Sequence, residues 1–311
     1  MIATPYTDVP IETGNAVAWN PSITGAKAEE TFVLTEAGAE VVAGADRVRE
    51  LKAVPAQPGY HWRVWAAEAV GTALLVLAIL LAVSLALGEG SPVADALPGR
   101  GAGFLLVGVL VAPCVALIAV SPLGRLSGAH LNPALTLGFW ALGRVSRPDL
   151  AGYLSAQLLG GVAGALAGRL LLPTPVTRSI GGTVTHPEVS TVAALALEAG
   201  MTALLVGVVL AFVSSDRLMR WTPLAIVPVL TAIIWLGSPW TGASLNPARS
   251  GGPAVAFGDY ADLWLYFAAP AAAGLAVGVF WRRLSMPRPR IAGLCPVTPA
   301  PLGALPVQTP K

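Results

Sequence analysis

The chain has 311 residues, of which 55% are hydrophobic and only 12% are charged, and its mean hydropathy is +0.69. A soluble domain of this length would carry more charge, so the composition excludes an ordinary soluble protein and favours one that lies in a lipid bilayer. The formal net charge is +2 and the basic residues form no continuous stripe, which argues against a nucleic-acid-binding protein.

The two ends of the chain differ from its apolar middle. Residues 1–60 contain no apolar run of membrane length and do not open with a signal peptide, so we expect a disordered cytoplasmic tail there. Residues 286–311 carry seven prolines, too many for a helix, and are predicted to be a second disordered tail.

Six apolar stretches between these tails are long enough to cross a hydrocarbon core of ~30 Å as helices. They lie at about 64–87, 102–120, 150–172, 191–213, 222–240 and 262–281. Two further apolar pieces, at about 131–143 and 245–257, are too short to cross. We therefore expect an all-α membrane protein with six transmembrane helices and two half helices, in one domain over 61–285.

The apolar part of the chain repeats itself. EAVGTALLV at 68–76 matches EAGMTALLV at 198–206, and GAHLNPA at 128–134 matches GASLNPA at 242–248, in the same order. Each half holds three spans, an odd number, so the second copy must be upside down relative to the first. The sequence predicts an inverted repeat of residues 61–172 and 190–283.

Basic residues predict the orientation of the spans. They precede the first span, flank the first short piece, follow the fourth span and follow the sixth, whereas the alternate loops carry acidic residues. By the positive-inside rule the basic side is the cytoplasm, so both termini are expected there.

Each short piece contains the tripeptide Asn-Pro-Ala. The six residues are Asn132, Pro133 and Ala134, and Asn246, Pro247 and Ala248. Asn is a preferred N-cap and Pro is favoured at the first helical position, so each piece is predicted to be a half helix that begins at its Asn. Inverted symmetry brings the two starts together near the bilayer midplane, where the NH2 group of each Asn is expected to be free to donate into a shared pore.

The irregular backbone before each Asn can exist at membrane depth only if it lines a wet cavity or is packed in protein. Its carbonyl groups are expected to line the pore as a ladder of acceptors. They belong to Gly128, Ala129, His130, Gly242, Ala243 and Ser244. Two helix N-termini, each worth about half a positive charge, meet at the centre and disfavour cations, so water is expected to pass and protons or sodium ions are not.

These motifs resemble the aquaporin, or major intrinsic protein, family over residues 62 to about 283. The resemblance is carried by SGAHLNPALTLGF at 127–139 and TGASLNPARSGGPA at 241–254. It implies a pore in every subunit, a homotetramer, and a location in the plasma or inner membrane. The sequence has neither a cluster of nucleophile and base nor a metal-ligand spacing, so no enzyme activity, cofactor or metal is expected.

Three ionisable side chains in the apolar region need an explanation. Glu68 and Glu198 occupy equivalent places in the two repeats, and we interpret them as acceptors for the N–H groups of the irregular Asn-Pro-Ala backbones rather than as a proton relay. In the family that this chain resembles, the position of Arg249 supplies the cationic edge of a selectivity filter. Arg249 could otherwise be an interfacial anchor that reaches to water.

The resemblance implies three more filter positions, which count back from the two Asn residues to Ala243, Ile234 and Val109, or Ala112 in place of Val109. These side chains lack the aromatic and His bulk of strict water channels. The motifs fit best a branch resembling the plant Nod26-like channels, which pass neutral metalloid acids and glycerol. Water-type residues stand at Ser250, Ala254, Tyr266 and Phe267.

The sequence thus predicts a passive channel for water and small uncharged solutes. A strictly water-selective aquaporin is the alternative. An ion-coupled secondary transporter that uses Glu68 and Glu198, or a purely structural membrane protein, is less well supported.

Overall fold

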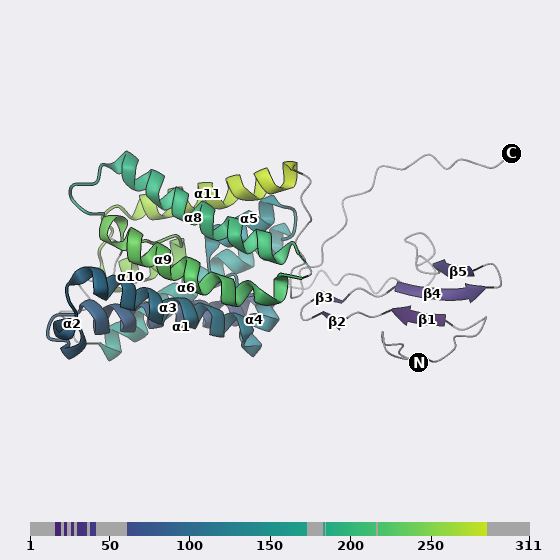
Figure 1. Ribbon diagram of the computed structural model, residues 1–311, viewed down its shortest axis with the longest axis horizontal. Helices are drawn as coiled ribbons and strands as arrows, with labels where there is room; N and C mark the ends of the chain where they lie inside the picture. Colours follow the sequence, from purple (N-terminus) through teal and green to yellow (C-terminus); the bar gives the residue numbers. More distant parts are fainter. Residues whose placement is uncertain are drawn as a thin grey trace.

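In a computed structural model the described residues are 61–172, 183, 185–215 and 217–284, together with five short strands near the N-terminus (Figure 1). The strands are β1 Ala16–Trp19, β2 Ser22–Ile23, β3 Ala26–Lys27, β4 Glu30–Thr35 and β5 Gly38–Val41. Strand β4 pairs antiparallel with β1 and β5, and β2 pairs antiparallel with β3. Neither the all-α prediction nor the prediction of a disordered tail over 1–60 included these strands. The rest of 1–60 and all of 286–311 lie outside the described residues, so the domain limits stay predictions.

Six helices are long and apolar enough to cross a membrane, as the sequence predicts. They are α1 Trp62–Leu87, α3 Arg100–Val120, α6 Arg147–Leu171, α8 Thr191–Val213, α9 Thr222–Thr241 and α11 Leu263–Arg283. The 3-10 turn η1 Met219–Trp221 leads into α9, and two short helices, α2 Pro92–Ala96 and α4 Pro122–Ser127, flank α3. The two predicted half helices are α5 Pro133–Ala141 and α10 Pro247–Phe257.

The packing of the helices follows the repeat. Helix α1 packs against α3 and α6, and its counterpart α8 packs against α9 and α11. Half helix α10 of the second repeat lies on α6 of the first, and α5 of the first lies on α11 of the second. Helices α3 and α9 meet each other. Each half helix is therefore held by a span of the opposite repeat, which places the two Asn-Pro-Ala motifs side by side.

Glycines allow these close helix contacts. A Cβ atom added at Gly160 or Gly164 of α6 would lie 2.2 Å from a backbone carbonyl oxygen of α1. A Cβ added at Gly274 or Gly278 of α11 would lie 2.0 Å or 2.3 Å from a carbonyl oxygen of α5. Glycines four residues apart on one face of α6 and of α11 thus let the helix backbones approach closely.

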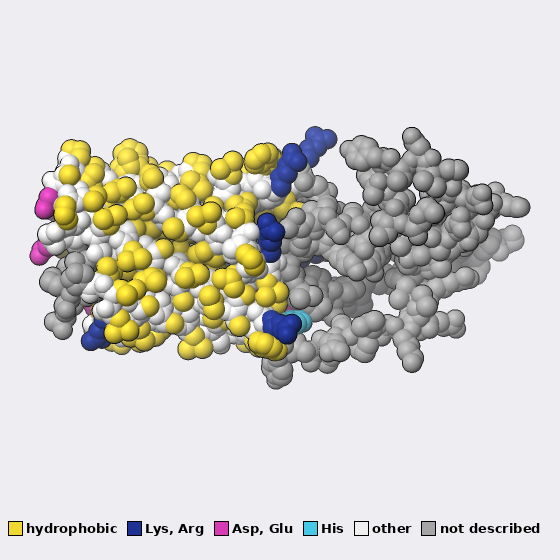
Figure 2. All heavy atoms as spheres, turned by 90° about the horizontal axis from the view of Figure 1, so that it is seen from below, with side chains coloured by type: hydrophobic (Ala, Val, Ile, Leu, Met, Phe, Trp, Pro, Cys, Tyr) yellow, Lys and Arg dark blue, Asp and Glu magenta, His cyan; other side chains and the backbone are white. Residues whose placement is uncertain are grey.

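The outside of the helical bundle is apolar along its length and charged at its ends. Figure 2 shows hydrophobic side chains over the length of the helices, with most of the visible Lys and Arg at one end, and with Asp and Glu beside a smaller basic patch at the other. Exposed aromatic side chains mark both ends, with Trp62 and Trp221 at the starts of α1 and α9, and Tyr260 and Trp264 near the start of α11. This is the arrangement expected of a helical bundle that faces lipid between two aqueous interfaces.

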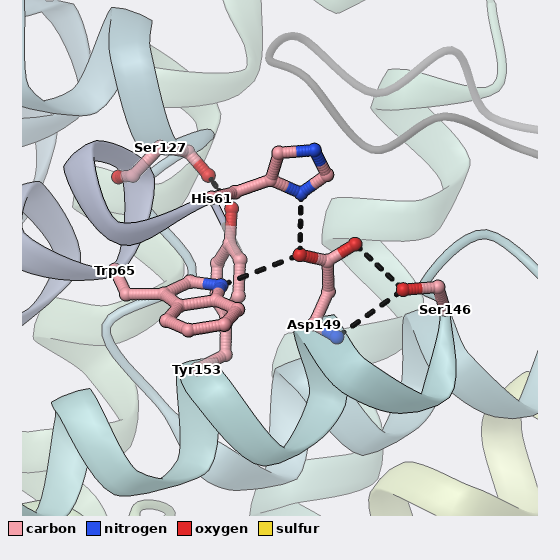
Figure 3. A network of polar contacts seen from close by, with 6 residues as sticks. All are labelled: His61, Trp65, Ser127, Ser146, Asp149 and Tyr153. Atoms are coloured by element: carbon pink, nitrogen blue, oxygen red, sulfur yellow. Dashed lines mark hydrogen bonds and ion pairs between the residues drawn. The ribbon is translucent and has the colours of Figure 1, made fainter. Parts of the chain in front are cut away.

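A polar network fixes the starts of α1 and α6 at the basic end (Figure 3). Asp149 accepts from Trp65 Nε1 at 3.3 Å and from Ser146 Oγ at 2.6 Å, and its Oδ1 lies 2.7 Å from His61 Nδ1. Tyr153, one turn further along α6, donates its hydroxyl to the carbonyl of Ser127 just before the first irregular loop. The network ties the first repeat's loop to two spans.

Candidate pore between two capped half helices

Each half helix is capped by its Asn as the sequence predicts. Asn132 Oδ1 accepts from Ala134 N at 2.8 Å, with Pro133 as the first helical residue. Asn246 Oδ1 accepts from Ala248 N at 3.0 Å and from Arg249 N at 3.3 Å. These bonds satisfy backbone donors that would otherwise be unpaired in the first turn.

The two Asn side chains also link the loops across the repeat. Asn132 Nδ2 donates to the carbonyl of Leu245, and Asn246 Nδ2 donates to the carbonyl of Leu131, both at 2.8 Å. The NH2 groups are donors at the cavity as predicted, but the prediction did not include this cross-link, which uses one of the two hydrogens of each group. The other hydrogen remains available to the cavity that both Asn residues line.

Both loops bend through left-handed backbone conformations at equivalent positions. Ala129 and Leu131 have φ of 49° and 52°, and Ala243 and Leu245 have φ of 45° and 55°. Left-handed backbone is unfavourable by roughly 1–2 kcal/mol for each residue with a Cβ, so surrounding contacts must hold these loops in place.

The two buried glutamates supply those contacts. Glu198 Oε1 accepts from Ser244 N at 2.9 Å and from Thr241 Oγ1 at 2.6 Å, and its Oε2 accepts from Leu245 N at 2.9 Å. Glu68 Oε1 accepts from Leu131 N in the first loop. Neither glutamate lines the cavity. The geometry fits the predicted role of loop support and gives no path for a coupled ion.

Sequence reasoning missed several side chains that complete this support. Gln157 of α6 is fully buried and donates its amide to Glu68 Oε1 and to Thr136 Oγ1, both at 2.9 Å. It is a polar residue inside an apolar span, the same signal that identified the glutamates. Thr136 also lies 3.1 Å from His130 Nδ1, and the His130 ring stacks on Phe139 at 4.7 Å. The His130 side chain is thus held by contacts within the first half helix.

A chain of hydroxyl groups supports the second loop from the acidic end. Ser250 Oγ lies within hydrogen-bond distance of Ser244 Oγ and accepts from Thr183 Oγ1 at 2.7 Å. Tyr266 donates its hydroxyl to the carbonyl of Thr241 at 2.8 Å. Nothing in the sequence pattern indicated the role of Thr183, because this residue lies in a connection between spans.

Between the loops and four of the spans lies a cavity of about 230 Å³. Its wall includes most of the predicted pore residues, namely Ala129, His130, Asn132, Ile234, Gly242, Ala243, Ser244, Asn246 and Arg249. Gly128 does not reach the wall, nor do Pro133, Ala134, Pro247 and Ala248, which are buried behind it. The cavity extends from Leu87 and Arg100 at the acidic end to Val115 and Ile226 toward the basic end, so its shape is that of a pore.

The predicted filter position on the second span is wrong. The Val109 side chain is 49% exposed on the outer face of α3, and Ala112 is fully buried without lining the cavity. The α3 side chains in the wall are Phe104, Val107, Val111 and Val115, which share one helical face. The extra helix α4 lengthens the connection before Asn132, so counting back from Asn132 stops on the wrong side of α3. Val107 and Val111, which belong to the same buried cluster as Ile234, line the cavity in place of Val109.

Arg249 presents hydrogen-bond donors to the cavity. Its Nη2 lies 3.5 Å from the carbonyl oxygen of Gly242, at the outer limit for a hydrogen bond. Its Nη1 is buried and has no hydrogen-bond partner among the described residues. A solute that reaches this point can accept from this guanidinium group.

An apolar exterior, six spans and a cavity that passes the starts of two half helices define a membrane channel whose central path lies within the single chain. The comparisons with known proteins agree. The family model for the major intrinsic protein matches residues 56–281. "Aquaporin Z" of Rhodopseudomonas palustris is 34% identical over 231 residues, covering 70% of this chain and 92% of that protein. "Aquaporin TIP4-4" of Zea mays is 35% identical over 237 residues, covering 73% and 92%.

Among solved structures, the aquaglyceroporin from Plasmodium falciparum aligns with a TM-score of 0.58 at 22% identity, covering 72% of this chain and 96% of that one. That likeness concerns the fold. The chain belongs to the major intrinsic protein family, and it is a multi-pass membrane protein that acts as a passive channel for water and small solutes.

Proposed function

We propose that this channel passes small uncharged solutes, such as glycerol, urea, and boric or arsenous acid, together with water. The observation that carries the proposal is the apolar wall that Val107, Ile234 and Ala243 form in the same cavity as Arg249. Each of these three side chains is at most 8% exposed and none is aromatic. Such a wall accepts a carbon backbone, while Arg249 donates to hydroxyl oxygens and the backbone carbonyl of Gly242 accepts from hydroxyl groups.

A strictly water-selective channel is the second candidate. It is favoured by the water-type residues Ser250, Ala254, Tyr266 and Phe267. The hydroxyl group of Ser250 is engaged with Ser244 and Thr183, so it braces the second loop and offers no charge to a passing polyol. We rank this candidate second because it does not account for the small apolar side chains in the wall.

Exclusion of protons and cations is assigned to Arg249 and to the two helix starts at Asn132 and Asn246. Each helix start contributes about half a positive charge, and the cavity wall contains no Asp or Glu among the described residues. A cation in the pore would therefore lose its hydration shell in a positive potential.

The assembly and location belong to the same proposal. We assign the protein to the plasma or inner membrane as a homotetramer with a pore in each subunit, and place both termini in the cytoplasm. The orientation rests on the basic end of the bundle and the positive-inside rule. We assign it no enzymatic activity and no cofactor, since the sequence offers neither a cluster of nucleophile and base nor a metal-ligand spacing.

The test is solute flux into proteoliposomes. Water, glycerol, urea and boric acid should enter faster than into protein-free vesicles, with rates linear in concentration and unaffected by a proton gradient. The double variant Ile234→His with Val107→Phe should reduce glycerol flux more than water flux, roughly tenfold against twofold, because bulk in the wall excludes the larger solute first. Val109→Phe, on the outer face, is the matched control and should change neither flux. Fast water flux without entry of glycerol, urea or boric acid would contradict the proposal and support the water-selective candidate.

A further inference from the structure

Arg100 stands at the outer mouth of the pore in a place where helix electrostatics disfavour it. It is the first residue of α3, the helix has no acidic residue in its first turn, and Gly99 provides no side-chain cap. The N-terminus of a helix carries partial positive charge and prefers anions. The loops on this side also carry few basic residues, as the positive-inside rule requires. A structural role does not explain a cation here.

The contacts of Arg100 direct it to the pore. Its guanidinium carbon lies 5.9 Å from the centre of the Phe104 ring, and both residues belong to the cavity wall. No carboxylate among the described residues pairs with Arg100. The other arginine of the described part at this end, Arg169, differs because it donates to the carbonyl of Ala256 at 2.6 Å.

Deeper in the same cavity, Arg249 is a second cation in the wall, and its Nη2 makes only a 3.5 Å contact with the carbonyl oxygen of Gly242. Its Nη1 is buried without a partner among the described residues. By the rise of a helix, Arg100 lies roughly 10 Å further out than Val107, which shares a buried cluster with Ile234. The space between the two guanidinium groups is lined by Val83, Leu87 and Phe104, with no acidic side chain in the wall of the described cavity.

We propose that this outer vestibule binds short-chain alkyl oxyanions, carboxylates or sulfonates, and that the bound anion obstructs the pore. The head group accepts from the part of the Arg249 guanidinium group that lines the cavity, the alkyl chain lies on the apolar wall, and Arg100 draws the anion to the mouth by its charge. The inference rests on the proposed function insofar as Arg249 faces the conducting path. Ligands of this size bind with dissociation constants on the order of millimolar.

The experiment measures osmotic water flux in proteoliposomes with 1-propanesulfonate on both faces of the membrane, so that protein orientation does not matter. A sulfonate stays ionised and does not cross lipid as a neutral acid. The ionic strength is held low with chloride, because salt screens charges at an exposed mouth. The rate of water flux in chloride alone tests whether the protein conducts water. The ratio of the rates with and without 1-propanesulfonate tests whether the anion binds and obstructs the pore.

In the unaltered protein 1-propanesulfonate should reduce the protein-dependent rate at least twofold at millimolar concentration, whereas neutral 1-propanesulfonamide should not. Arg100→Gln should require roughly tenfold more sulfonate for the same fractional reduction, since one charge is lost, and Arg100→Lys should behave nearly as the unaltered protein. Arg63→Gln is the matched control, because Arg63 also lies over an aromatic ring, at 5.4 Å from Trp62, but in the first turn of α1, at the opposite end of the bundle from Leu87 and Arg100.

Three outcomes would overturn the site. They are fast water flux that sulfonate leaves unchanged, equal reduction by sulfonate and sulfonamide, and equal reduction in Arg100→Gln and the unaltered protein. Slow water flux in chloride alone would contradict the proposed function instead.

Discussion

At the scale of single residues, the molecule concentrates its polar groups on two loops. Asn132 and Asn246 each cap their own half helix and also bind the opposite loop, so the same side chain sets both the helix start and the distance between the two starts. Glu68 and Glu198 hold the loop backbones in their left-handed bends. Arg249 lines the cavity, and part of its guanidinium group is left without a partner among the described residues.

We predict that Arg249→Val will leave water flux within about twofold and will admit small cations or protons. A cation at about 8 Å from a fixed positive charge, at an effective dielectric constant near 20, is repelled by about 2 kcal/mol. Loss of this repulsion corresponds to roughly a thirtyfold faster leak. The measurement is dissipation of a potassium or proton gradient in proteoliposomes, with water flux recorded on the same sample. An unchanged leak would mean that Arg249 is an anchor and that the helix starts exclude cations by themselves.

At the scale of elements, the half helices are positioned by glycines on the spans of the other repeat. A Cβ atom added at Gly161 of α6 would lie 2.4 Å from the carbonyl oxygen of Ala248, and one added at Gly252 of α10 would lie 2.3 Å from the carbonyl oxygen of Gly161. These contacts are backbone to backbone, so no side chain can move aside to relieve a larger residue. The position of Arg249, one residue after Ala248, depends on them.

We therefore predict that Gly161→Ala will lower both stability and flux. Forcing a methyl group into this contact costs about 1–3 kcal/mol and displaces the first turn of α10. The thermal unfolding midpoint in detergent should fall by several degrees, and water flux should fall severalfold. Gly200→Ala is the matched control, because nothing lies within 4 Å of the added Cβ on α8. If the two variants behave alike, the close approach of α6 and α10 does not position the pore.

At the scale of the whole molecule, an even number of spans returns the chain to the side from which it started, and basic residues gather at that end. The chain offers its own probe of this topology, because its two cysteines are Cys114 in α3 and Cys295 in the C-terminal segment. Once Cys114 is removed, a thiol-reactive probe that labels Cys295 reports on which side of the membrane the C-terminal segment lies.

We predict that, in Cys114→Ser, a membrane-impermeant maleimide will label Cys295 in inverted membrane vesicles and not in intact cells. Ala28→Cys in a background without Cys114 and Cys295 should give the same result for the N-terminal segment. Labelling of either position from outside intact cells would reverse the orientation derived from the basic residues.

The sequence by itself determined the number of spans, the inverted repeat, the capped half helices and the two supporting glutamates. Each of these follows from a local pattern, such as an apolar run of membrane length or an Asn before a Pro. Such a pattern can be recognised without knowing which residues are neighbours in space. The strands within residues 16–41 were not predicted, because short strands of mixed polarity show no comparable pattern in the sequence.

Tertiary structure alone decided which side chains meet in the cavity. The change from Val109 to Val107 depends on the rotation of α3 against α9, and counting residues cannot follow that rotation across the extra helix α4. The cross-links from Asn132 to Leu245 and from Asn246 to Leu131 join residues more than a hundred positions apart. The place of Arg100 at the mouth likewise appears only once α3 is packed, because burial and direction are properties of neighbours in space rather than in sequence.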